Sequence, residues 1–174
     1  MAKKIITFGL SPSGIDKAIR ELEWYKIIFQ RKVETYRHRI GEEIALDSSF
    51  NFGQSVMDDV VQGSTRKPNV TVNLDERGGI TVVVADGEDA VWCEFGAGVY
   101  HNGSVGSSPH PKGSELGFTI GSYGFGRGKQ TAWGYYDNGQ LVITRGTPAS
   151  MPMYNAVQSV TKKAIEIARE VFGE

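Results

Sequence analysis

Residues 15–45 read IDKAIRELEWYKIIFQRKVETYRHRIGEEIA, and their apolar side chains recur mostly every three or four positions. That spacing predicts one long amphipathic α-helix. If unbroken, it would be about 45 Å long at 1.5 Å per residue, although Gly41 could end or bend it. The predicted apolar stripe consists of Ile15, Ala18, Ile19, Leu22, Tyr25, Phe29, Val33, Tyr36, Ile40 and Ile44.

Three apolar residues of this helix, Trp24, Ile27 and Ile28, lie off the stripe. They indicate a second buried face, covered either by the chain's own sheet or by another subunit. Before the helix, residues 4–10 predict a short strand, and Ser13 with Asp16 resembles a helix N-terminus. After it, residues 52–62 could form a short second helix.

From residue 69 the apolar period changes to two, which is typical of strands. Alternating runs at 70–74 and 80–84 flank Arg77-Gly78-Gly79 and predict an antiparallel hairpin. Residues 90–95 predict a third strand. Residues 131–137 and 140–144 predict another hairpin around Asn138-Gly139.

A final helix is expected at about 152–172, because Pro152 suits a first helical turn. Its predicted apolar seam consists of Met153, Val157, Val160, Ala164, Ile167 and Val171. Strands cluster instead of alternating with helices, which indicates an α+β fold. The 174 residues suit a single domain, 1–174. We expect an antiparallel sheet of hairpins packed by the long N-terminal helix and the C-terminal helix.

A glycine-rich loop, expected to be mobile, occupies about residues 99–130. It is no phosphate-binding P-loop, because Tyr123 stands where the first glycine would be and Gln130 follows Lys129. Aromatic and basic residues in the loop could stack on single-stranded nucleic acid, but protein contact is favoured because the chain has no wide basic field. The predicted partner-binding residues are Tyr100, Tyr123, Phe125, Arg127, Lys129, Trp24 and Ile27.

Groups that could carry chemistry are few. Cys93 is the only cysteine and is expected to be buried and inert. The three histidines, His38, His101 and His110, have no cysteine or spaced carboxylate to complete a metal shell. We therefore predict no catalytic residue, no cofactor and no metal. One alternative remains, a small cell-wall hydrolase in which Glu94 works with an acid from 86–89.

Charge is unevenly distributed along the chain, although the net charge is −1. Residues 1–40 hold nine Lys/Arg and four Asp/Glu, whereas residues 41–100 hold three and eleven. If the basic segment of one subunit meets the acidic segment of its neighbour, this charge difference could steer their association and fix their relative position. The alternative is that folding mixes the segments and leaves no charged patch. No apolar run approaches the roughly 20 residues of a membrane span.

Two motifs resemble those of a known family. They are Glu94-Phe95-Gly96-Ala97-Gly98, at the end of a predicted strand, and Thr144-Arg145-Gly146-Thr147-Pro148-Ala149. The second motif continues through Met151-Pro152-Met153 and Ala156, and Trp133 with Tyr135 stands between the two. In order and spacing these residues resemble the phage tail-component family typified by gene product 10 of phage HK97. Residues 46–66 depart from the family pattern, since only Gly53-Gln54-Ser55-Val56 is similar.

The resemblance implies a structural protein of a tailed-phage particle, made in the host cytoplasm and placed where the tail joins the capsid. It implies a tail-completion or neck component that forms a ring with copies of itself and contacts head–tail connector and tail proteins. It also implies no cofactor, and a tail terminator is the close alternative. The residues that carry the motif, expected to be structural, are Glu94, Phe95, Gly96, Gly98, Trp133, Thr144, Gly146 and Pro152.

Overall fold

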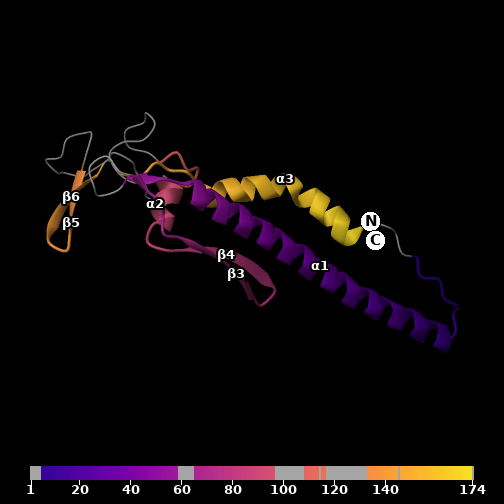
Figure 1. Ribbon diagram of the computed structural model, residues 1–174. Helices are drawn as coiled ribbons and strands as arrows, with labels where there is room; N and C mark the ends of the chain where they lie inside the picture. The colour runs from indigo at the N-terminus through magenta and orange to yellow at the C-terminus, as the bar shows by residue number, and fades with distance from the viewer. Residues whose placement is uncertain are drawn as a thin grey trace.

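The computed structural model describes residues 5–58, 65–96, 108–113, 115–116, 133–144 and 146–173. These residues form an α+β fold (Figure 1). Its helices are α1 (Pro12–Gln54), α2 (Ala90–Phe95) and α3 (Pro152–Phe172). Its strands, in antiparallel pairs, are β1 (Met57–Asp58) with β2 (Thr65–Arg66), β3 (Thr71–Arg77) with β4 (Ile80–Asp86), and β5 (Trp133–Asp137) with β6 (Gln140–Thr144). Most of the predicted 99–130 loop lies outside the described residues.

Helix α1 begins earlier than its sequence pattern predicted. Ser11, not Ser13, is the N-cap, since its side chain accepts a hydrogen bond from the Gly14 amide at 3.2 Å. Pro12 follows in the first turn, where a missing N–H costs nothing. The strand predicted at 4–10 is wrong for the described residues 5–10, which lie outside any helix or strand.

The helix continues through Gly41, where the β3–β4 hairpin packs closely against it. A Cβ there would lie 2.5 Å from Thr81 Cγ2 and 2.7 Å from Leu74 Cδ1. The helix ends at Ser55, whose amide and hydroxyl both donate to the Asn51 carbonyl. A separate helix at 52–62 is therefore wrong for the described residues, because residues 52–54 belong to α1 and Met57–Asp58 form strand β1, while residues 59–62 lie outside the described residues.

The hairpin predicted around Gly78-Gly79 is confirmed, with Arg77 opposite Ile80 and Thr71 opposite Asp86. Both glycines have positive φ, 54° and 86°, as the tight type I′ turn requires. One face of the hairpin packs on α1, where the Arg37 side chain donates to Thr81 Oγ1 at 2.9 Å. The other face is exposed and carries Ile80, Val82 and Val84.

The third strand predicted at 90–95 is wrong, because this segment is helix α2. Ala90, Cys93 and Glu94 are buried, whereas Val91 and Trp92 are each over 40% exposed. This is a helical period of three to four and not the alternation of a strand. Cys93 and Ala90 pack with Phe52 and Met57 in a small core between α2 and the end of α1.

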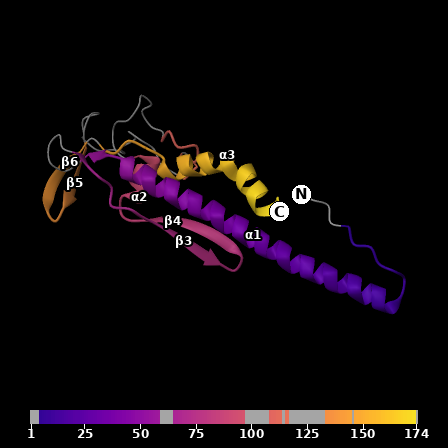
Figure 2. The same cartoon turned by 45° about the vertical axis from the view of Figure 1, so that its right-hand side comes forward.

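The hairpin β5–β6 and the helix α3 are confirmed. Positive φ at Asn138 and Gly139 forms the turn between the two strands. Helix α3 runs antiparallel to α1. At its start the Pro152 carbonyl accepts a hydrogen bond from Asn51 Nδ2, and at its end the Phe172 ring lies 5.9 Å from the Phe29 ring. In its seam Val160 and Ile167 are buried, but Val157 is 41% exposed, contrary to the predicted pattern. Figure 2 shows α3 and the β3–β4 hairpin both lying along α1.

Two glycines of α1 give a matched test of this packing. Gly53→Ala adds a Cβ with nothing within 4 Å, so it should stabilise the protein by about 0.5–1 kcal/mol through helix propensity. Gly41→Ala should instead destabilise by about 1–2 kcal/mol, because the hairpin must move away from the helix. Urea unfolding of both variants measures this. Equal stabilisation by the two would contradict the packing described here.

Candidate interaction surfaces and the Glu94 joint

The N-terminal part of α1 projects beyond every element that packs on it (Figures 1 and 2). Helix α3 ends at Phe172, against Phe29. The face of α1 that meets α3 continues toward the N-terminus at the helical spacings seven, three and four as Leu22, Ile19 and Ile15. These side chains are 56%, 48% and 43% exposed. We call residues 12–28 the arm; at 1.5 Å per residue it is about 25 Å long.

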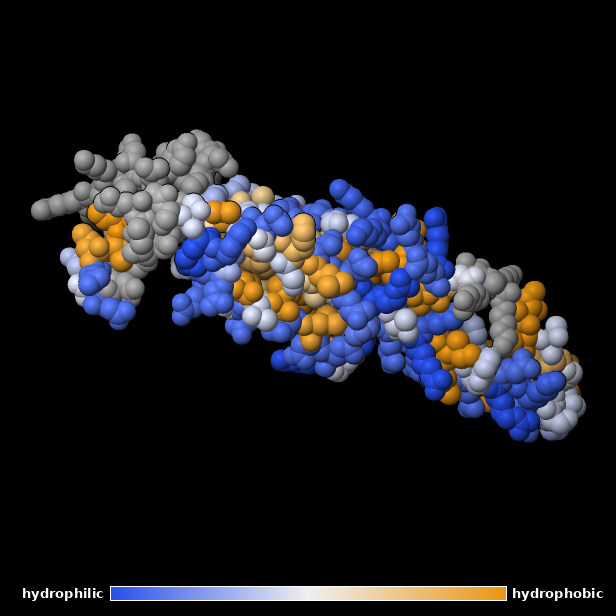
Figure 3. Space-filling model, viewed as in Figure 1, coloured by the Kyte–Doolittle hydropathy of each residue, from blue (hydrophilic) through white to orange (hydrophobic). Residues whose placement is uncertain are grey.

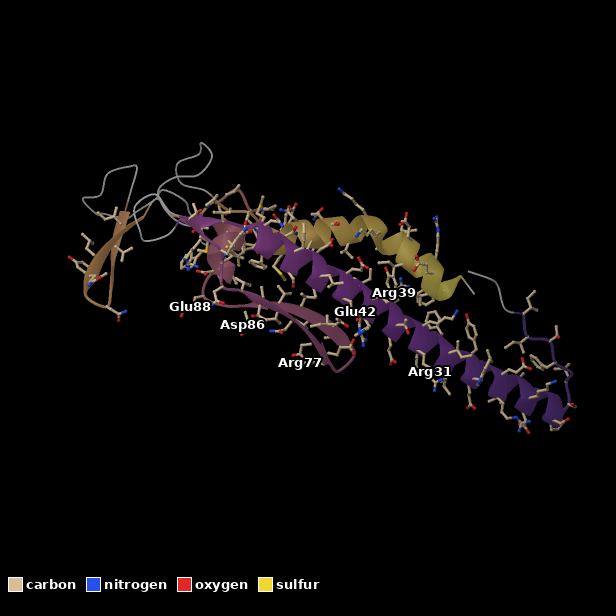
Figure 4. All side chains as sticks on the ribbon, viewed as in Figure 1. Arg31, Arg39, Glu42, Arg77, Asp86 and Glu88 are labelled. Atoms are coloured by element: carbon tan, nitrogen blue, oxygen red, sulfur yellow. The ribbon has the colours of Figure 1, made fainter. Side chains whose placement is uncertain are left out.

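Trp24 and Ile27 also lie on the arm, 60% and 48% exposed. The sequence predicted a second buried face here, and the chain's own hairpin does not bury it. Coverage by another subunit stays a prediction. Figure 3 shows hydrophobic residues among hydrophilic ones on the projecting part of α1. In Figure 4, Arg31 marks the part of α1 that directly follows the arm. The same view shows Asp86 and Glu88 at one end of the β3–β4 hairpin and Arg77 at the other.

Glu94 joins α2 to the start of α3. Its side chain is 10% exposed, and its two oxygens accept hydrogen bonds from the Met153 and Tyr154 amides at 2.8 and 2.9 Å. The first amides of a helix have no partner within it, and the helix dipole favours a negative charge there. Glu94 therefore caps α3 from a position about 60 residues earlier in the chain.

The neighbouring motif residues complete this joint. The Cys93 carbonyl accepts the amides of Ser150 and Met151 at 2.9 and 3.2 Å. Gly96, at φ 80°, and the buried Gly146, at φ 92°, hold left-handed backbone that a side chain would strain. Pro152, the first residue of α3, is under 2% exposed.

The other predicted motif residues are less informative. Trp133 and Thr144 are directly opposite each other in β5 and β6, and Phe95 closes α2. Gly98 lies outside the described residues, as do five of the predicted partner-binding residues. Those five are Tyr100, Tyr123, Phe125, Arg127 and Lys129.

His110 belongs to the same joint, although the sequence pattern gave it no role. Its Nε2 lies 3.2 Å from Glu94 Oε1, and its ring lies 4.5 Å from the Phe95 ring and 5.3 Å from the Tyr154 ring. Its Nδ1 accepts the Lys112 amide at 3.0 Å, which fixes the ring with Nε2 on the side of Glu94. Glu94 thus accepts two helix amides and has the His110 ring nitrogen beside it.

Asp89, one of the acids at 86–89, is a buried ion-pair partner of Arg66. Its carboxylate accepts two hydrogen bonds from Arg66 at 2.6 and 2.7 Å and one from the Asn69 amide at 2.7 Å. The Arg66 hydrogen bonds lower the pKa of Asp89, with the Asn69 amide acting in the same sense. The pair fixes the segment before β3 to the start of α2.

The prediction of a buried Cys93 is confirmed, with an exposure of 0%. Burial raises the pKa of its thiol to about 11, so it stays protonated at neutral pH. Among the described residues, no three His, Cys, Asp or Glu side chains gather as metal ligands would. Over the same residues, no helix is both long and apolar enough to cross a bilayer.

His38 attaches strand β3 of the hairpin to α1. Its Nδ1 lies 3.0 Å from Glu76 Oε1, on β3, and its Nε2 lies 3.2 Å from Glu42 Oε1, one turn along α1. The hydrogen bond to Glu76 raises the pKa of His38, and Glu42 adds to the effect. The same contact lowers the pKa of Glu76.

Comparisons with known proteins give no relative for this chain: no family model, no curated protein and no solved structure matches it.

Glu94→Gln tests the joint. The amide side chain keeps one accepting oxygen but loses the charge that faces the α3 N-terminus, so the variant should lose about 1–2 kcal/mol of unfolding free energy. Glu88→Gln is the control, since Glu88 is an exposed side chain nearby in sequence, and it should change stability by less than about 0.5 kcal/mol. Chemical denaturation measures both. An unchanged Glu94→Gln stability would contradict the capping role.

The His38 contact predicts a pH-dependent attachment of the hairpin. Because the folded pKa of His38 is raised above 6.5, its contribution to stability is present below that pH and disappears as pH rises through the folded pKa. Wild type should therefore exceed His38→Gln in Tm at about pH 6, and the difference should shrink at about pH 9. The effect should be small because both partners are exposed. A difference that grows with pH would contradict it.

Proposed function

We propose that this chain is a structural subunit of a tailed-phage particle, a tail-completion or neck protein at the junction of tail and capsid. It acts by associating with copies of itself and with neighbouring connector and tail proteins. The observation that carries the proposal is the exposed apolar face of the arm. Leu22, Ile19 and Ile15 continue the face that α3 covers further along α1.

Such a surface is costly to leave in water. Burying one large aliphatic side chain is worth about 1.5–3 kcal/mol, and contiguous exposed apolar surface marks an interaction site more often than a free face. The arm projects away from the rest of the chain (Figure 1), so a second polypeptide can pack along it. This is the property that a ring-forming subunit needs.

The resemblance of the Glu94 and Thr144–Ala156 motifs to tail-component proteins supplies the phage context. The motif residues have structural roles that agree with it, since Glu94 and Pro152 build one joint between α2 and α3. The same geometry weighs against a hydrolase. Both Glu94 oxygens are occupied by helix amides, and Asp89, an acid of the 86–89 turn, is held by Arg66.

Self-association is tested by measuring the mass of the purified protein at micromolar concentration, by light scattering or native mass spectrometry. We expect a multiple of the 19.0 kDa chain mass. Leu22→Glu should weaken assembly on the order of tenfold or more, because it places a charge in the covered apolar face. Glu23→Gln, an exposed polar change on the same arm, is the matched control and should assemble as wild type does.

The location is tested separately in tailed particles assembled with an epitope-tagged copy. Antibody label at the head–tail junction is the expected result in electron micrographs. A protein that stays monomeric at all concentrations, or one absent from purified particles, would overturn the proposal.

A further inference from the structure

The segment before α1 is apolar and lies outside any helix or strand. Residues 5–10 read Ile-Ile-Thr-Phe-Gly-Leu, with Ile5 74%, Phe8 54% and Leu10 95% exposed. Ile6 is half-buried. In an extended conformation Ile6, Phe8 and Leu10 would share one face. The sequence therefore has strand character that the single chain does not use.

The β3–β4 hairpin offers a place for such a strand. Within the described residues its sheet has two strands, so β4 has no partner on its outer edge. Arg77 and Ile80 close the two-residue turn and form a hydrogen-bonded pair. By alternation, the backbone groups of Thr81, Val83 and Ala85 point outward from the hairpin.

Strand β4 also lacks, over residues 80–85, the devices that protect an edge strand; its one charged residue, Asp86, stands at the end far from the turn. Proteins usually block exposed edges with charges, prolines or bulges. Residues 80–85 read Ile-Thr-Val-Val-Val-Ala, with neither a charge nor a proline, and Ile80 is 63% exposed. The other edge is different, since β3 carries Asp75, Glu76 and Arg77 at its turn end. Of the two edges, β4 is the one suited to accept a strand.

The segment cannot reach β4 of its own chain. Helix α1 begins at Pro12, and the turn end of the hairpin is bonded to it at Arg37, which donates to Thr81 and to the Gly79 carbonyl. These helix positions are about 38 Å apart at 1.5 Å per residue. Leu10 adjoins the helix start, and residues 5–10 extend about 20 Å at most. Only a second molecule can bring the two together.

We propose that residues 5–10 of one copy add as a third strand to the outer edge of β4 in a second copy. The added backbone would pair with Thr81, Val83 and Ala85, and apolar side chains of the segment would lie beside the exposed row of Ile80, Val82 and Val84. The inference rests on the proposed function, because it identifies the contact through which copies associate.

Amide hydrogen exchange, read residue by residue by NMR or by electron-transfer mass spectrometry, tests the contact on the full-length assembled protein and on a variant lacking residues 2–10. In wild type the amides of Thr81, Val83 and Ala85 should exchange at least about tenfold more slowly than in the variant. The amides of Val82 and Val84 are internal controls, because they face β3 in both proteins. Circular dichroism establishes that the shortened chain is folded.

A synthetic peptide of residues 3–11 gives a second measurement that does not depend on assembly. Added to the shortened chain, it should restore slow exchange at Thr81, Val83 and Ala85. A scrambled peptide of the same composition should not.

Each outcome is decisive. An assembled wild type without selective protection of these three amides, or a shortened chain that assembles as wild type does, would overturn strand addition and leave the proposed function standing. Slow exchange on β3 at Val72 and Leu74 in place of β4 would also overturn it. A wild type that is monomeric at every concentration would overturn both proposals.

Discussion

The length of α1 is the constraint on which the rest of the structure depends. The helix has 43 residues and α3 has 21, so at 1.5 Å per residue the first is about 65 Å long and the second about 32 Å. The apolar face of α1 runs past the end of α3 at Phe172. Over the part of the chain that the structure describes, the elements packed on α1 therefore leave its N-terminal part uncovered.

The described core is correspondingly small and depends on polar joints. Phe52, Met57, Ala90 and Cys93 form its buried apolar cluster. Around it, Glu94 accepts amides of α3, and Asp89 accepts Arg66 and the Asn69 amide. The desolvation cost of a buried carboxylate is offset where several hydrogen-bond donors contact it. These two carboxylates fix how α2 meets the helices and the hairpin, which explains why Glu94 stands in an otherwise apolar run.

Local signals predicted the elements that local chemistry determines. The stripe from Ile15 to Ile44, the Gly78-Gly79 turn and the Asn138-Gly139 turn all carry their information within a few residues. The wrong predictions concern segments whose secondary structure depends on residues far away in the sequence. Residues 90–95 are a short apolar run whose period is ambiguous, and the pairing of β1 with β2 ended the helix predicted at 52–62. The partner of Glu94 is 59 residues away at Met153, so no short pattern could reveal its capping role or that of His110.

Strand addition would also determine the geometry of the assembly. The donor segment precedes Pro12 and the acceptor edge is fixed to Arg37, so the two lie at different places on the same molecule. A contact between unlike patches is heterologous: each copy gives a strand to one neighbour and receives one from another. Such contacts close into a ring when the rotation between copies divides a full turn, and otherwise they extend as a filament. The arm and the part of α1 that carries the hairpin belong to one helix, so the donor segment is held in a fixed direction relative to the acceptor edge. A flexible linker would leave that rotation undetermined. In the proposed strand addition, the length of α1 and the outer edge of β4 are thus complementary features of one joining mechanism.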